Sequence, residues 1–274
     1  MPKVRIHDLE MYYEVRGKGF PLIMINWYSA DSEGWDSFVP MVKELSKHYR
    51  VVAPDNRGTG RSKATKADYS IKIMADDVAG LLDSLRISKA NVLGRSMGGM
   101  VAQELAINHP KKVNGLILVC TTSRGFAYET SPQQREVHEK LRWMFAPPQG
   151  MSQEAIAEEI LRLCFCKEFF DENKASIMSF ISKYPTPLST IRKQYDAMDK
   201  FYTYDRLRMI SSKTLIIHGE DDKILVPDGA RTLAKHIPKA ELKIFKQAGH
   251  SVLEEKWHEA KPVILDFLKN LDAY

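Results

Sequence analysis

The sequence predicts an α/β protein in which a mostly parallel central sheet is flanked by helices and carries an inserted helical cap. Two observations indicate this class. Short apolar strand patterns alternate with helical patterns up to about residue 122 and again from about residue 206, as a parallel sheet with crossover helices requires. Between 123 and 205 no strand pattern occurs, and amphipathic helical stretches are broken by prolines. We therefore expect an α/β core of residues 1–122 and 206–274 and a cap, or lid, of residues 123–205.

The elements of the core follow from their periodicity and their boundary residues. Strands of the first part are expected at 4–6, 11–15, 22–25, 49–53, 90–93 and 116–120. Helices are expected between these strands at 35–47, 71–85 and 98–109. The last of them ends at His109-Pro110, because a residue before proline rarely stays helical. Beyond the cap, the same alternation predicts a strand at 214–218, a helix at 228–236, a strand at 241–245 and a helix at 257–271.

Composition limits the classes of function. The net charge of +5 is spread along the chain rather than gathered in a basic block, so no nucleic-acid partner is expected. The chain shows neither the apolar run of a secretory signal nor a membrane span, which predicts a cytoplasmic protein without a membrane partner. The three cysteines, Cys120, Cys164 and Cys166, are too few and too clustered for a disulfide framework or a zinc site and are expected to be reduced thiols. The oligomeric state stays open, a homo-oligomer included.

A serine motif is the most informative feature of the chain. An apolar strand pattern runs into Gly94-Arg95-Ser96-Met97-Gly98 and then directly into a helical pattern. A G-x-S-x-G sequence in this setting is typical of a nucleophile elbow, a tight strand-to-helix turn that presents a serine hydroxyl. The helix directs its positive end at Ser96, where an oxyanion would form, and the N–H of Met97 is the first expected oxyanion donor. The alternative is a turn that merely connects strand and helix, and the flanking patterns favour the nucleophile.

A serine nucleophile needs a base and a carboxylate that orients the base. In an open parallel sheet, such residues lie in loops just after the carboxyl ends of strands. The two strands expected beyond the cap are followed by loops that contain Asp222 and His250. The order Ser, Asp, His along the chain is that of an α/β-hydrolase triad, so Asp222 is the predicted acid and His250 the predicted base.

Each of these two residues has a competitor. Asp221 adjoins Asp222, but it is expected to point away in a tight loop and to cap or pair nearby. His218 ends a strand, and we expect it to be a buried, hydrogen-bonded histidine beneath the site. The remaining histidines fall in surface, helix or helix-end contexts, where solvated or satisfied side chains are the rule.

With these motifs the chain resembles the serine members of the α/β-hydrolase superfamily, particularly the arylesterases, cofactor-free haloperoxidases and 3-oxoadipate enol-lactonases. The resemblance covers nearly the full length. Beside the serine motif it includes Asp55-Asn56-Arg57-Gly58-Thr59-Gly60-Arg61-Ser62, which matches the D-x-R-G-x-G-x-S loop of that group, His218-Gly219-Glu220-Asp221-Asp222 and Gly249-His250. It implies an α/β-hydrolase fold and a triad of Ser96, Asp222 and His250, and it calls for no metal or organic cofactor. The loop from Asp55 to Ser62 is expected to brace the turn below the site rather than to take part in chemistry.

The second oxyanion donor is expected in the loop after the strand at 22–25. In the group that the chain resembles, this strand usually ends in His-Gly, whereas this chain has Asn26-Trp27. By position, the resemblance implies that the following residue, Tyr28, donates its N–H, with Trp27 as a secondary candidate. The side chain of Trp27 is also a candidate for the wall of the substrate pocket.

The segment from 123 to 205 resembles the helical cap that covers the pocket in this superfamily. Most of its aromatic and methionine side chains are expected to form its own core, and a minority to make an apolar acyl or aryl pocket that faces the serine. Beside Trp27, the pocket candidates are Arg124 and Trp143. The full set is Phe126, Trp143, Met144, Phe145, Phe165, Phe169, Phe180, Tyr184, Tyr195, Met198, Phe201 and Tyr202.

The expected reaction is hydrolysis of a carboxylic ester or lactone with a small to medium apolar group, through an acyl-enzyme. Three alternatives stay open. A hydrolase of carbon–carbon bonds in dienoic acids would need a cation such as Arg95 or Arg124 for the substrate carboxylate, although Arg95 is expected to face away because its neighbour Ser96 faces in. A perhydrolase, or cofactor-free haloperoxidase, would use the same triad with peroxide in place of water. A lactone-binding receptor with slow turnover would report occupancy to a partner protein.

Overall fold

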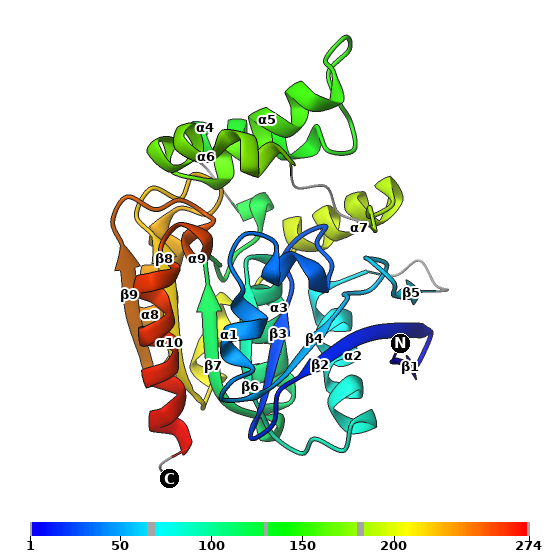
Figure 1. Ribbon diagram of the computed structural model, residues 1–274, viewed down its shortest axis with the longest axis vertical. Coiled ribbons are helices and arrows are strands. Elements are labelled where there is room, and N and C mark those ends of the chain that lie inside the picture. Colours follow the sequence, from blue (N-terminus) through cyan, green and yellow to red (C-terminus); the bar gives the residue numbers. More distant parts are fainter. Residues whose placement is uncertain (1, 65–68, 129–130, 180–183, 273–274) are drawn as a thin grey trace.

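A nine-stranded sheet forms the centre of the described chain in the computed structural model (Figure 1). The structure describes residues 2–64, 69–128, 131–179 and 184–272. The strands follow one another in the order β1-β2-β4-β3-β6-β7-β8-β9, and β5 pairs with β2 outside this path. All pairs from β4 to β9 are parallel, whereas β2 is antiparallel to its neighbours β1, β4 and β5. Their bounds are β1 Lys3–Ile6, β2 Leu9–Arg16, β3 Pro21–Ile25, β4 Arg50–Pro54, β5 Lys63–Ala64, β6 Ala90–Arg95, β7 Val113–Val119, β8 Lys213–Gly219 and β9 Ala240–Phe245.

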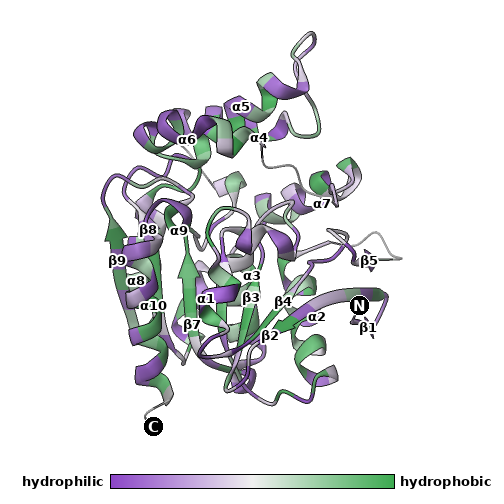
Figure 2. Cartoon of the chain, viewed as in Figure 1, coloured by the Kyte–Doolittle hydropathy of each residue, from purple (hydrophilic) through white to green (hydrophobic). Residues whose placement is uncertain are grey.

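The central strands are apolar throughout because both faces of the sheet are covered. Side chains alternate along each strand, so neighbouring residues enter different layers. In β3, Leu22 and Met24 pack into one hydrophobic cluster, and Ile23 and Ile25 pack into the other. Figure 2 shows the resulting concentration of hydrophobic residues along the sheet. These two clusters hold the strands whose carboxyl ends carry the site.

Helices cover the two faces of the sheet in separate sets. The layer that contains Leu22 is closed by α1 (Met41–Leu45), α9 (Val252–Glu255) and α10 (Trp257–Asp272). The layer that contains Ile23 is closed by α2 (Ile71–Ser84), α3 (Met97–Asn108) and α8 (Pro227–His236). Among the described residues, no helix is both long and apolar enough to cross a membrane.

A helical insertion separates β7 from β8 and lies above the carboxyl ends of the strands (Figure 1). Two of its helices begin where a serine caps them: the Ser131 hydroxyl accepts the N–H of Gln134, and the Ser152 hydroxyl accepts the N–H of Ala155. The helices alternate hydrophilic and hydrophobic residues in Figure 2, as expected of elements with one face on the core. Their bounds are η3 Phe126–Tyr128, α4 Pro132–Arg142, α5 Gln153–Cys164, α6 Lys167–Ser179, α7 Leu188–Asp199 and η4 Tyr204–Met209.

The two ends of the insertion are joined by a neck, which we define as residues 123–125 and 201–203. The N–H of Gly125 donates to the carbonyl of Phe201 at 2.6 Å, and the N–H of Thr203 donates to the carbonyl of Ser123 at 2.9 Å. A Cβ on Gly125 would lie 2.0 Å from the carbonyl oxygen of Met198, so a glycine is required for this close pairing. The chain therefore leaves the core and returns to it at one place.

The fold class and the strand–helix alternation are as predicted, with two local differences. The single helix expected at 35–47 is instead a 3₁₀ turn, η1 (Ser32–Asp36), followed by the short helix α1. Pro40 lies between them. It prevents one continuous helix, because proline lacks the N–H that a helix interior needs. The Asp36 carboxylate accepts the N–H of Val42 at 2.7 Å and thereby stabilises the start of α1. The second difference is β5, whose two residues are too few to leave a periodic pattern.

Candidate active site

Ser96 sits on a tight turn between β6 and α3. Its backbone has φ 53° and ψ −117°, a conformation with positive φ that costs a non-glycine residue energy and occurs where the surrounding structure enforces it. Two glycines enforce it here. A Cβ on Gly94 would lie 2.2 Å from the carbonyl oxygen of Gly98, and one on Gly98 would lie 2.1 Å from that of Ile25. The turn predicted from the serine motif is therefore present, and it brings the end of β3 next to the serine.

The structure brings Ser96, His250 and Asp222 into one hydrogen-bonded chain. The loop after β8 carries Asp222, and the loop after β9 carries His250. His250 Nε2 lies 2.9 Å from Ser96 Oγ, and His250 Nδ1 lies 2.8 Å from Asp222 Oδ2. All three residues are buried. This arrangement lets the imidazole take the serine proton while the carboxylate holds the ring and stabilises its charged form.

The two neighbouring aspartates differ in their surroundings. Asp222 is buried, and its Oδ1 accepts the N–H groups of Ile224 and Leu225 at 2.9 and 3.0 Å. Asp221 is exposed, and its backbone N–H donates to the carbonyl of Ala248 at 2.8 Å. The structure thus brings Asp222, and not Asp221, to His250.

The environment of Asp222 keeps its carboxyl group ionised. Burial by itself raises the pKa of Asp222, but interaction with the charge of His250 and hydrogen bonds from His218 and His250 outweigh this effect. The pKa of Asp222 is held well below its ordinary value as a result. A carboxylate in this state is suited to stabilise an imidazolium.

The loop after β3 is braced from the neighbouring strand. Asn26, which is fully buried, donates from Nδ2 to the carbonyl of Pro54 at 3.1 Å, and Asn56 Nδ2 donates to the carbonyl of Asn26 at 2.9 Å. A Cβ on Gly98 would come within 2.6 Å of the carbonyl oxygen of Asn26, which fixes this loop against the start of α3. The side chain of Asn26 therefore stabilises a loop in which Asn26-Trp27 replaces the usual His-Gly.

The inserted helices hold the same loop from the other side. The N–H of Ser29 donates to Gln194 Oε1 on α7 at 2.9 Å, and the Thr186 hydroxyl donates to the carbonyl of Ser29 at 2.9 Å. Tyr28 comes directly before Ser29, and burial raises the pKa of its hydroxyl far above the ordinary value. Met97 is the first residue of α3, where a backbone N–H has no acceptor within the helix. The roles of Tyr28 and Met97 as oxyanion donors stay predictions.

Trp27 and Arg95 pack against each other beside the elbow. The Trp27 ring meets Trp35 edge-on at 5.2 Å between centroids, and the Arg95 guanidinium lies 4.3 Å from the Trp27 ring centre. Arg95 also pairs with Glu254 and donates to Ser251 Oγ at 3.0 Å. Arg95 is therefore engaged by Glu254, Ser251 and the Trp27 ring, and its expected orientation away from the pocket stays a prediction.

The two other pocket candidates make contacts within the inserted segment. Arg124 is exposed, and its guanidinium lies 3.9 Å from the centre of the Tyr204 ring. Trp143 follows α4, and the Lys140 ammonium lies 5.9 Å from its ring centre. The structure does not bring either residue into the hydrogen-bonded chain of Ser96, and their place in a pocket stays a prediction.

Most described aromatic residues of the insertion pack into hydrophobic clusters, but they share these clusters with the core instead of forming, as was expected, a core of the cap alone. Tyr195 and Phe201 join the large cluster shared with α2 and α3. Phe165 and Phe169 stack at 5.6 Å between centroids and meet Phe38 from the loop after η1. Phe180, which was included in the expected set, lies outside the described residues.

The loop from Asp55 to Ser62 has the bracing role that was expected of it. Asp55 is fully buried and accepts the N–H groups of Ser32 and Arg61, each at 2.7 Å. The Arg57 guanidinium makes two hydrogen bonds each to Asp77 and Asp8, at 2.8–3.0 Å. Paired bonds of this kind fix a planar guanidinium in one orientation.

The carboxylate of Glu255 links the loop that carries His250 to the insertion, a role that the sequence did not reveal. Glu255 Oε1 accepts the N–H of Gly249 at 2.8 Å, and its Oε2 accepts the N–H of Cys166 at 2.9 Å. The N–H of Ser251 donates to the carbonyl of Cys164 at 2.7 Å. A Cβ on Gly249 would come within 2.8–3.1 Å of backbone atoms of the residues from Cys164 to Cys166. His250 thus lies between two residues that are bonded to the junction of α5 and α6.

We expect Glu255→Ala to lower the free energy of unfolding by about 1–3 kcal/mol, because it leaves the N–H groups of Gly249 and Cys166 without their acceptor. Burial raises the pKa of Glu255, so relief of this buried charge offsets part of the loss. Urea denaturation measures the effect. The matched control is Glu259→Ala, at a side chain that is 64% exposed. Equal stability of both variants would contradict the bridging role.

The three cysteines are free thiols in the structure. Burial raises the pKa of Cys164 to about 12, and burial together with a hydrogen bond to Glu255 raises the pKa of Cys166 to about 11. The pKa of the fully buried Cys120 thiol is raised well above its ordinary value, also by burial. Protonated thiols are poor metal ligands and poor nucleophiles. The free thiols agree with the expectation of reduced cysteines.

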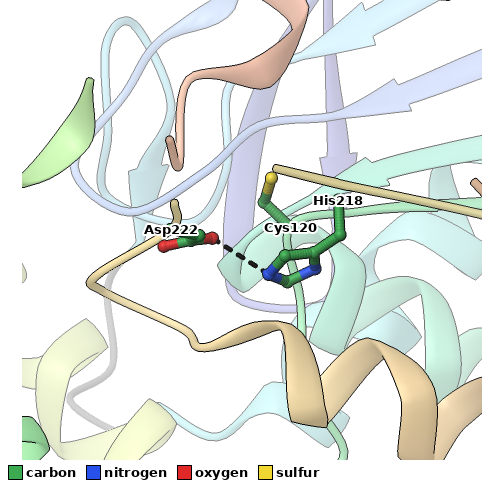
Figure 3. A group of neighbouring side chains, drawn as sticks. All are labelled: Cys120, His218 and Asp222. Atoms are coloured by element: carbon green, nitrogen blue, oxygen red, sulfur yellow. Dashed lines mark ion pairs between the residues drawn. The ribbon is translucent and has the colours of Figure 1, made fainter. Parts of the chain in front are cut away.

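One group of side chains has donor atoms close enough together to suggest a metal site. Single donor atoms of Cys120, His218 and Asp222 lie within 4.8 Å of one another, and all three residues are buried (Figure 3). His218 Nε2 lies 2.6 Å from the carbonyl oxygen of Leu225, which can only accept a hydrogen bond. This nitrogen therefore carries a hydrogen and has no lone pair for a metal ion in the observed arrangement.

Known proteins resemble this chain over nearly its full length. Residues 19–256 match the family described as alpha/beta hydrolase fold. The chain is 30% identical over 267 residues to a 2-hydroxymuconate semialdehyde hydrolase of Pseudomonas sp. strain CF600, covering 94% of this chain and 89% of that protein. Among solved structures, the enol-lactonase from Burkholderia xenovorans LB400 superposes with a TM-score of 0.82 at 27% identity, covering 98% of this chain and 100% of the other. A thermophilic esterase from Thermogutta terrifontis gives 0.80 at 26% identity, covering 99% of both chains.

Proposed function

Because this chain belongs to the alpha/beta hydrolase fold family, we propose that it hydrolyses carboxylic esters or lactones of small to medium size through an acyl-enzyme on Ser96. The observation that carries this proposal is the hydrogen-bonded chain from Ser96 through His250 to Asp222 on a strand-to-helix turn. It supplies a nucleophile, a base and an orienting carboxylate at hydrogen-bond distances. The likeness to an enol-lactonase and to an esterase supports the same chemistry.

In the proposed first step, Ser96 Oγ attacks the carbonyl carbon of the substrate while His250 Nε2 takes its proton. The backbone N–H groups of Met97 and Tyr28 stabilise the oxyanion, and Asp222 stabilises the imidazolium. As the tetrahedral intermediate collapses, His250 returns the proton to the leaving oxygen. In the second step His250 takes a proton from water as the water attacks the acyl carbon, and on collapse it returns this proton to Ser96 Oγ, which leaves as the acid is released.

The surroundings of two arginines help to distinguish hydrolysis of an ester or lactone from hydrolysis of a carbon–carbon bond. Cleavage of a carbon–carbon bond in a dienoic acid calls for a cation that receives the substrate carboxylate. Arg95 is paired with Glu254, and Arg124 is stacked on Tyr204 at the surface, so both candidate cations are engaged elsewhere. This observation favours a neutral ester or lactone as the substrate.

Carbon–carbon hydrolysis is the second candidate. The observation in its favour is the 30% identity to a 2-hydroxymuconate semialdehyde hydrolase over 94% of this chain. The same three residues serve both reactions, and only the substrate-binding groups differ. Direct comparison of substrates is therefore the decisive experiment.

Steady-state hydrolysis of p-nitrophenyl esters from acetate to decanoate, beside a neutral enol-lactone and 2-hydroxymuconate semialdehyde, tests the proposal. We expect kcat/KM to peak at one acyl length or at the lactone. A larger kcat/KM for the semialdehyde than for every ester and lactone would reassign the chain to carbon–carbon hydrolysis. One-to-one labelling of Ser96 without turnover of any substrate would overturn the enzymatic proposal in favour of a lactone-binding receptor.

A further inference from the structure

A second histidine contacts the carboxylate of the triad. His218 is the last residue but one of β8, and its ring lies beside Asp222 (Figure 3). His218 Nε2 is 3.1 Å from Asp222 Oδ2, the same oxygen that lies 2.8 Å from His250 Nδ1. His218 and Asp222 are both buried, so water does not compete for these contacts.

The contacts of His218 define its tautomer. Nε2 faces two oxygens, the carbonyl of Leu225 at 2.6 Å and the carboxylate of Asp222 at 3.1 Å, and both are acceptors. The hydrogen is therefore on Nε2, where it bonds the carbonyl of Leu225 and lies against the carboxylate of Asp222. The other ring nitrogen, Nδ1, is buried and has no hydrogen-bond partner among the described residues.

His218 also contacts the loop that carries Asp222. Asp222 Oδ1 accepts the N–H groups of Ile224 and Leu225, its Oδ2 accepts from His250, and His218 Nε2 lies against the same Oδ2 at 3.1 Å. Leu225 takes part twice, because its N–H donates to Asp222 while its carbonyl accepts from His218. With three hydrogen bonds and the contact of His218 on its two oxygens, the carboxylate has one orientation, and that orientation faces His250.

We propose that His218 is a positioning residue that holds the Asp222 carboxylate in line with His250 and shares its negative charge. This inference rests on the proposed hydrolase function, since it assigns a role in the same triad. Two effects follow from its Nε2–H. Its contact with Asp222 Oδ2 opposes rotation of the carboxylate away from His250, and its positive end draws charge toward the oxygen that His250 uses. The other titratable group packed against His218 is the Cys120 thiol at the end of β7, which burial keeps protonated.

Removal of this donor has an effect on the pH profile that loss of packing alone does not have. Without His218 the charge of Asp222 falls more fully on His250 and favours the protonated imidazole. The acid limb of the pH–rate profile, which reports the essential base of the free enzyme, then moves to higher pH by roughly half to one unit. Weaker orientation of the carboxylate also lowers the maximal rate by about 10- to 100-fold. This is the range found when a residue that hydrogen-bonds to a metal ligand is replaced.

The test compares His218→Leu and His218→Phe, which remove the donor, with His218→Gln, whose amide restores an N–H at a similar reach. The measured quantity is the rate constant for reaction of Ser96 with a fluorophosphonate between pH 5 and 9, so no natural substrate is needed. Circular dichroism and thermal denaturation identify which variants are folded. We expect the lower rate and the upward shift in folded donor-free variants, and near wild-type behaviour in His218→Gln.

Several outcomes would overturn the proposal. A folded donor-free variant with the wild-type rate and midpoint would show that His218 does not act on the triad. An equal loss in all three variants with an unchanged midpoint would assign His218 to packing alone. ¹⁵N NMR of the wild-type protein gives a reading that needs no folded variant, since an Nδ1–H tautomer for His218 contradicts the proposal. Labelling of Ser96 without ester or lactone turnover would overturn the proposed function while leaving the His218 comparison intact.

Discussion

Replacement of Ser96 by alanine is expected to reduce ester turnover by roughly a million-fold, the loss seen when a serine protease loses its nucleophile. The reason is geometric: Ser96 Oγ is the atom that lies 2.9 Å from His250 Nε2. The fold is expected to stay intact, because alanine and serine meet a positive φ with the same Cβ and the glycines that enforce the turn are unchanged. Initial rates with the best p-nitrophenyl ester, corrected for the uncatalysed reaction, measure the effect.

The matched control is Ser212→Ala. Ser212 lies just before β8, at the opposite end of the sheet, and its buried hydroxyl has no partner among the described residues. This variant is expected to keep the wild-type rate and stability. If Ser96→Ala retained activity well above the background rate, the nucleophile would have to be sought elsewhere.

Asp222→Asn is expected to lower kcat by about 10⁴-fold, as the equivalent change does in a serine protease. An asparagine can keep its oxygen toward the N–H groups of Ile224 and Leu225, and its NH₂ group then faces both His250 and His218. His250 must present a lone pair to that NH₂ group, so its hydrogen moves to Nε2. A ring in that tautomer cannot accept the proton of Ser96.

Asp221→Asn is the comparison that makes this result specific. Asp221 is exposed, and its described hydrogen bond to the core comes from the backbone, so its side chain is expected to matter less than threefold to kcat. Both variants change one adjacent carboxylate to an amide, and both can be assayed with the same ester over the same pH range. The reverse ranking of the two variants would transfer the role of acid to Asp221.

Much of the core was predictable because its strands are short apolar runs with clear boundaries. The pattern from Leu22 to Ile25 predicts β3, and the pattern from Asn91 to Leu93 lies within β6. The prediction of one helix from Trp35 to Lys47 was wrong, because it gave the apolar spacing more weight than the proline within the segment. Pro40 interrupts the backbone hydrogen bonds of that segment, whatever its side-chain periodicity indicates.

The triad was predictable because its chemistry needs particular residue types at the carboxyl ends of strands. His218 was expected beneath the site, and the structure places its ring against Asp222. The pocket candidates Arg124 and Trp143 were chosen by their place along the chain, and nothing in the chain order specifies which way a cap side chain turns. The same limit explains why the role of Glu255 was not predicted, because its partner Cys166 lies 89 residues away along the chain.

The closed neck at residues 123–125 and 201–203 has a consequence for the evolutionary history of such a protein. The ends of the insertion are bonded to each other, and β7 and β8 pair directly beneath them, so the core is closed whatever lies between. For a flexible segment, doubling the length between such fixed ends costs only about 0.6 kcal/mol in loop entropy. Lengthening of the insertion away from Cys164, Cys166 and Gln194, which hold the loops of the site, can therefore alter which molecules are accepted while the proton-transfer residues are inherited unchanged. Substrate preference and catalytic competence can diverge at separate rates in one gene.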